Sequence, residues 1–98
     1  MSSFINKNSI PVMEKEKGGS ELLWRKEDDK HILLARHDIY VLNEFSREIL
    51  EMCNGKNTVN DIAILISKKY DLEIDFALKN IMEFLEYAYE KELVKVEV

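Results

Sequence analysis

The stretch from Ile39 to Gly55 reads IYVLNEFSREILEMCNG and joins an apolar strand directly to a short helix. Asn43 is a good N-cap, because its side-chain oxygen can accept a hydrogen bond from an N–H group of the first helical turn. We expect the helix to end at Asn54 and Gly55, a pair that favours the left-handed conformation. Its apolar face carries Phe45, Ile49, Leu50 and Cys53.

Two further apolar runs precede this stretch, from Leu22 to Arg25 and from His31 to Ala35. The connectors, Glu27 to Lys30 and Arg36 to Asp38, are short and polar, so neighbouring runs should pair antiparallel as a meander. A three-stranded sheet with one buried face is near the lower limit for a stable sheet. We therefore expect helices to cover it.

Two more helices are predicted after the first. Thr58 is an N-cap candidate, with Asp61 three residues later in an imperfect version of the capping box. Asp75 is the expected cap of a third and longest helix, from Phe76 to about Lys91. The second helix has the apolar stripe Val59, Ile62, Ala63, Leu65 and Ile66, and alternating Val94, Val96 and Val98 predict a terminal strand.

The beginning of the chain has a different character. Residues 1–20 are polar and interrupted by Pro11 and by the Gly18-Gly19 pair, which predicts a flexible N-terminal arm. A short strand containing Ile10, Val12 and Met13 is the alternative. The rest, residues 21–98, is predicted as one α+β domain like a winged helix-turn-helix, with a three-stranded antiparallel β-meander followed by a three-helix bundle.

Composition excludes several classes of protein. The 98 residues carry a net charge of −5, and the basic residues are scattered, which argues against nucleic acid and favours a basic peptide or protein as partner. Cys53 is the single cysteine, so no internal disulfide can form. The chain lacks a signal peptide pattern and has no run approaching ~20 apolar residues, so we expect a cytoplasmic protein without a membrane span.

No pattern of catalytic or metal-binding residues emerges. His31 and His37 are expected to be solvated turn residues, without partners at metal-ligand spacing. Cys53 lies on the apolar helix face and is expected to be a core residue, not a nucleophile. Three glycines, none in a phosphate-binding pattern, exclude a nucleotide loop. The sequence thus predicts no enzyme activity and no cofactor.

The segment from Leu22 to Val94 resembles the PqqD-like family of precursor-peptide recognition elements. The shared pattern is a W-R strand, a second apolar strand, a "Y-x-LN-E" junction, "G-x-x-TV-x-x-I" opening the second helix, "FL" in the third and a final "LV". Glu92 departs from it, because many relatives have glycine there. We expect this glutamate to lengthen the last helix.

The resemblance implies three antiparallel strands packed on three helices. It also implies capture of a leader peptide as an added strand between the third strand and the third helix. Which side of that strand faces the peptide stays open, since a shift of one residue exchanges the two faces. The implied peptide-binding residues are Ile39, Tyr40, Val41 and Leu42 at the edge, Lys79, Asn80, Glu83 and Tyr87 in the wall, and Phe76 and Phe84 in the floor.

The function implied is that of a non-catalytic adaptor that presents a ribosomally made precursor peptide to a modifying enzyme, a radical SAM enzyme with an iron-sulfur cluster. The adaptor itself would need no cofactor. One alternative is a winged-helix DNA-binding regulator, although the exposed face of the third helix is predicted to carry Glu83, Glu86 and Glu90 beside a single lysine. Another is a homodimerising accessory subunit, so monomer and homodimer both stay open.

Overall fold

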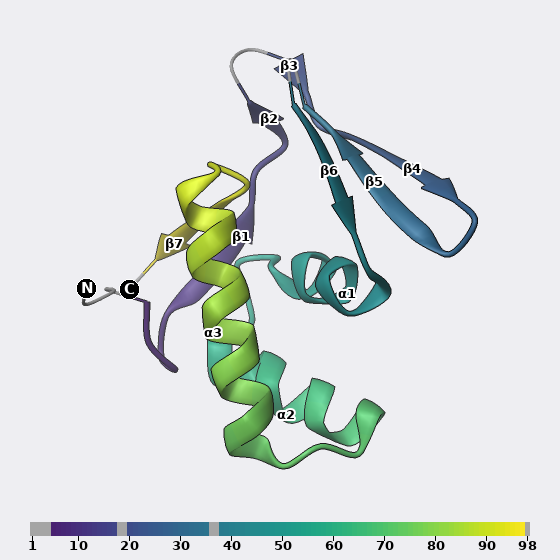
Figure 1. Ribbon diagram of the computed structural model, residues 1–98. Helices are drawn as coiled ribbons and strands as arrows, with labels where there is room; N and C mark the ends of the chain where they lie inside the picture. Colours follow the sequence, from purple (N-terminus) through teal and green to yellow (C-terminus); the bar gives the residue numbers. More distant parts are fainter. Residues whose placement is uncertain (1–4, 18–19, 36–37, 98) are drawn as a thin grey trace.

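The computed structural model describes residues 5–17, 20–35 and 38–97. Within these residues it is a mixed α+β fold with a three-stranded antiparallel sheet, two smaller strand pairs and three helices (Figure 1). The elements are β1 (Ile10–Met13), β2 (Glu16–Lys17), β3 (Ser20–Glu21), β4 (Leu23–Glu27), β5 (Lys30–Leu34), β6 (Ile39–Leu42), α1 (Glu44–Met52), α2 (Val59–Tyr70), α3 (Ile74–Glu90) and β7 (Val94–Glu97).

The predicted meander is confirmed. Strands β4, β5 and β6 are neighbours in that order, and both pairs are antiparallel. Asp28 has a φ of 54°, a left-handed conformation that aspartate tolerates and that lets the β4–β5 hairpin close in two residues. The second connector contains residues 36 and 37, which lie outside the described part of the chain.

Local capping explains where the first two helices begin. The Oδ1 atom of Asn43 accepts a hydrogen bond from the Ser46 N–H at 2.8 Å, so the predicted cap of α1 is confirmed. At α2, Thr58 Oγ1 accepts from the Asp61 N–H at 3.1 Å, and Asp61 Oδ2 accepts from the Thr58 N–H at 3.0 Å. The capping box is therefore complete with aspartate in the place of glutamate.

The third helix differs from its prediction at its start and in the effect of Glu92, whereas its end, with Lys91 as C-cap, agrees with the prediction. It begins at Ile74 with Glu73 as N-cap, so the prediction that Asp75 caps it is wrong. Asp75 lies instead in the first turn, where a carboxylate is also favourable because of the helix dipole. The helix ends at Glu90, and Glu92 does not lengthen it. Glu92 has a φ of 62°, the left-handed conformation that glycine adopts without strain.

Residues 5–17 of the predicted flexible arm contain a paired strand, and residues 1–4, 18 and 19 of that arm lie outside the described part of the chain. Strand β1 pairs antiparallel with β7, from Ile10 opposite Glu97 to Met13 opposite Val94, so the short-strand alternative describes it better. Ile5 is 3% exposed and belongs to the core cluster. The prediction fails because the partner of β1 comes from the other end of the chain, which local sequence patterns cannot show (Figure 1).

The same segment also covers the start of α2. The Ser9 carbonyl accepts a hydrogen bond from the Val59 N–H at 2.9 Å, and the Lys7 carbonyl accepts one from the Asn60 N–H at 2.9 Å. Both donors belong to the first helical turn, which has no partners inside its own helix. Residues 5–17 are thus integral to the domain.

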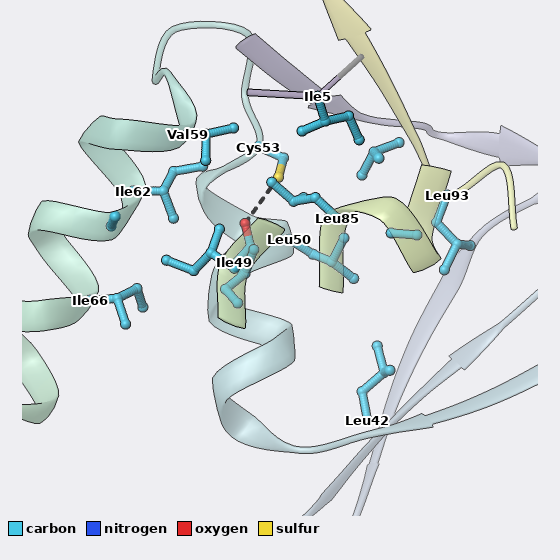
Figure 2. Packing of buried hydrophobic residues seen from close by; sticks show 14 of the residues in the cluster. Ile5, Leu42, Ile49, Leu50, Cys53, Val59, Ile62, Ile66, Leu85 and Leu93 are labelled. Carbon is cyan, nitrogen blue, oxygen red and sulfur yellow. Dashed lines mark hydrogen bonds between the residues drawn. The ribbon is translucent and has the colours of Figure 1, made fainter. Parts of the chain in front are cut away.

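The core lies between the three helices, the inner side of the sheet and the N-terminal segment (Figure 2). Cys53 is buried there and donates from Sγ to the Ile49 carbonyl at 3.1 Å, so its prediction as a core residue is confirmed. Burial raises the pKa of its thiol to about 12. In the described part of the chain no helix is both long and apolar enough to cross a membrane.

Candidate functional site

The free edge of the sheet is the first half of the candidate site. Among the described strands, β6 pairs only with β5 and so ends the three-stranded sheet on one side. In Figure 1, β6 is the strand of this sheet drawn nearest to α3. The strand contains only apolar side chains and tyrosine, without the lysine or proline that often protects an edge from further pairing.

The hydrogen-bond pattern determines which backbone groups point to that edge. Ala35 and Asp38 exchange two backbone hydrogen bonds of 2.9 and 3.2 Å. In an antiparallel pair, hydrogen-bonded and non-hydrogen-bonded positions alternate. The backbone groups of Tyr40 and Leu42 therefore point to β5, and those of Ile39 and Val41 point to the free edge.

Burial resolves the phase of the strand, which the sequence left open. The side chains of Tyr40 and Leu42 face the core and are each 8% exposed. Little of either is left for a peptide to contact. The side chains of Ile39 and Val41 lie on the other face and are 69% and 59% exposed. At the edge, Ile39 and Val41 thus offer both backbone groups and apolar surface.

The predicted wall residues form a stripe along α3. Phe76, Asn80, Glu83 and Tyr87 follow one another at spacings of four, three and four residues, which places them on one side of the helix. Phe76 and Tyr87 are exposed large apolar side chains, and Glu83 is exposed. The Asn80 side chain donates from Nδ2 to the Phe76 carbonyl at 2.8 Å, so part of its hydrogen-bonding capacity is already used.

The two remaining residues of the predicted site differ in burial. Phe84 is half-buried and packs against the core, and its ring centroid lies 6.4 Å from that of Tyr87. Lys79 is exposed and stands one turn before Glu83. The Lys91 ammonium lies 5.8 Å from the centre of the Tyr87 ring. Phe84 thus contacts the α3 stripe through Tyr87, whereas the Lys79 side chain is exposed to solvent.

Arg47 was not singled out by the sequence, yet it ties α1 to the inner face of the sheet. Its guanidinium carbon lies 4.4 Å from the Trp24 ring centre, and its Nη1 lies 3.2 Å from Nδ1 of His31. His31 is half-buried in β5, so the prediction of a solvated turn residue is wrong. No sequence signal links these residues, because they meet only through the packing of α1. His37 lies outside the described residues.

The part of the sequence that forms this site matches a known protein family. The family model described as coenzyme PQQ synthesis protein D (PqqD) matches residues 30–94, which is more than half of the chain. The chain belongs to the PqqD family. The PqqD match contains β5, β6 and α3, and therefore every residue of the predicted site. None of the curated proteins matches the chain.

A solved structure of a PqqD is similar over nearly the whole chain. It is the solution NMR structure of the PqqD truncation of Methylobacterium extorquens PqqCD, described as a functional and stand-alone RiPP recognition element, that is, one for ribosomally synthesised and post-translationally modified peptides. The two share 22% sequence identity with a TM-score of 0.74, and the match covers 93% of this chain and 94% of that one. At this identity the likeness shows a common fold.

Proposed function

We propose that this PqqD-family protein is a non-catalytic adaptor that binds the leader of a ribosomally made precursor peptide and presents it to a modifying enzyme. The observation that carries the proposal is the free, apolar edge of β6 in a chain of this family. An unpaired edge can accept an extended peptide as a further strand, a common mode of peptide recognition.

The backbone of β6 supplies the affinity in this proposal. Ile39 and Val41 each direct one N–H donor and one C=O acceptor outward, which is enough to align a short strand. The side chains of the peptide would then point alternately to the two faces of the sheet. Those on the inner side would meet the α3 stripe, with Phe76 and Tyr87 as apolar contacts and Glu83 as an acidic one.

Charge points to the kind of leader that would bind. The protein carries a net charge of −5, and Glu83 and Glu90 are exposed on α3. A leader with basic residues next to its apolar strand is attracted to this surface, whereas an acidic one is repelled. The same acidic surface disfavours the alternative of a winged-helix DNA-binding regulator, and the winged-helix description itself stays a prediction.

The adaptor would act through effective concentration. Tethering the leader makes capture of the rest of the precursor by the enzyme nearly intramolecular, which raises the apparent affinity by about 10²-fold or more where the geometry allows. We propose a radical SAM enzyme as the partner, and no cofactor is needed in the adaptor itself.

Amide hydrogen exchange measured by NMR tests the proposal. The open reading frames that flank the gene are first searched for a short precursor peptide. The probe is a synthetic peptide with the leader sequence of that precursor, first titrated by calorimetry. The amides of Ile39 and Val41 should exchange about 10-fold more slowly in the complex, because they gain partners, as is usual for newly hydrogen-bonded amides. Tyr40 and Leu42, which already bond to β5, are the internal control and should change little. Tight binding without protection of Ile39 and Val41 would refute strand addition.

A further inference from the structure

The outer face of the three-stranded sheet carries an apolar patch. Residues directly opposite each other in antiparallel strands point to the same face. The register places Leu23 opposite Leu34 and Leu34 opposite Ile39, and it places Ile32 opposite Val41. We call these five side chains the outer patch. They form two adjoining cross-strand rows that both reach the free edge at β6, one starting at Leu23 in β4 and the other at Ile32 in β5.

The outer patch is open, whereas the inner face of the sheet is covered. On the inner face Arg47 of α1 stacks on Trp24, and Leu33 is fully buried. On the outer face Leu23 is 52% exposed, and Ile39 and Val41 are still more exposed. None of the five residues is among those that pack against the core cluster. Packing against the described core therefore does not explain why all five are apolar.

Charges next to the outer patch are largely neutralised. Arg25 lies on the same face, two residues after Leu23, and pairs with Glu27 at 2.9 Å between Nη2 and Oε1. Exposed Lys30 lies opposite Glu27 on the same face, so this part of an otherwise acidic protein presents apolar surface with a small positive charge. Contiguous exposed patches of this kind mark sites of protein interaction.

A second copy of the chain is a poor occupant for this surface. Five partly exposed aliphatic side chains cover on the order of a few hundred Å², whereas a stable interface buries about 800 Å² from each partner. Two copies that each carry a charge of −5 also repel one another. The patch needs a partner that is not acidic and that finds additional surface next to it.

We propose that the outer patch is the docking surface for the modifying enzyme, and that the bound leader completes this surface. The inference rests on the proposed function. A strand added to β6 directs every second side chain outward, next to Ile39 and Val41, so it extends the two rows by one strand. The apolar surface is thus larger when the leader is bound. The modifying enzyme must act on the loaded adaptor, so it is the partner that would benefit from this larger surface.

Coupling between peptide and enzyme follows from this arrangement. The enzyme contacts more apolar area on the loaded adaptor than on the empty one, so it binds the loaded adaptor more tightly. By linkage, the enzyme strengthens leader binding by the same factor. The adaptor would thus deliver peptide and leave the enzyme once it is empty.

Leu23→Glu tests the docking surface, because Leu23 lies in β4, two strands away from the peptide edge. The matched control is Leu65→Glu on α2, the same substitution at a leucine that is 48% exposed. Enzyme affinity is measured by surface plasmon resonance with the modifying enzyme identified from the flanking open reading frames, with and without the synthetic leader. Leader affinity of each variant is measured separately by calorimetry, and circular dichroism checks the fold.

We expect Leu23→Glu to weaken enzyme binding about 10-fold, as loss of a buried apolar contact does, with leader binding unchanged. Leu65→Glu should leave both unchanged, and leader should strengthen enzyme binding to the wild type. Equal enzyme affinity of the two variants would overturn the inference, as would a dimer of the free wild type that Leu23→Glu dissociates. Absence of leader binding to the wild type would instead refute the proposed function.

Discussion

Replacement of Ile5 by alanine tests whether the N-terminal segment belongs to the core. The Ile5 side chain is 3% exposed and is a member of the central cluster, 25 residues before the part matched by the family model. Truncation of a buried isoleucine to alanine costs about 2–5 kcal/mol. Because Ile5 lies near the chain end, where the structure can relax, we expect about 2–3 kcal/mol, a large share of the ~5–15 kcal/mol of a typical domain.

Urea unfolding followed by the fluorescence of Trp24, the single tryptophan, measures this loss. With a slope of about 1–1.5 kcal/mol/M, the expected loss moves the midpoint down by about 2 M. The matched control is Ile64→Ala at a residue of α2 that is 38% exposed, which should change stability by about 0.5 kcal/mol or less. If Ile5→Ala unfolds at the same urea concentration as the control, the N-terminal segment is not part of the core.

Three other predictions follow from local features. Thr58→Ala removes one half of the capping box and should lower the free energy of unfolding by about 1 kcal/mol in urea titrations. Glu92→Gly relieves a left-handed conformation and should raise the free energy of unfolding by about 1 kcal/mol, and a lower urea midpoint than that of the wild type would contradict this. Burial raises the pKa of Cys53 from 9.0 to about 12, so the unfolded chain loses the thiol proton first and stability falls as the pH rises through this range. The free energy of unfolding should fall by up to about 1.4 kcal/mol per pH unit. In Cys53→Ala, measured under the same conditions, the contribution of the thiol to this fall should be absent.

Much of the fold could be predicted because its signals are local. Asn43 and Thr58 begin their helices through hydrogen bonds within three residues, and short polar connectors dictate an antiparallel meander. The failures involve contacts between distant segments. Strand β1 is four residues long, contains Pro11 and pairs with β7 from the opposite end of the chain. Its own sequence is compatible with a short strand and with a loop, and only the distant partner decides between them.

The strand and the helix that form the candidate site could be predicted from the sequence, whereas the orientation of the β6 side chains could not. All four residues of β6 favour burial, so the sequence alone cannot decide which two face the core. The structure decides through the packing of Leu33 and α1 on the side of Tyr40 and Leu42. The outer patch could not be predicted for the same reason, because the sequence does not show on which face of the sheet a side chain lies. Leu23, Ile32 and Leu34 look like core residues in the sequence, and only the register shows that they share an uncovered face.

The pairing of β1 with β7 has a practical consequence for protein engineering. The start of β1 lies beside the end of β7, with Ile10 opposite Glu97. A circularly permuted chain, with a linker that joins the residues before β1 to those after β7 and with new termini at the exposed Asp28-Asp29 turn, should therefore keep the same fold. Such a chain would keep the β6 edge intact, and its new termini could be tethered to a surface or to another protein.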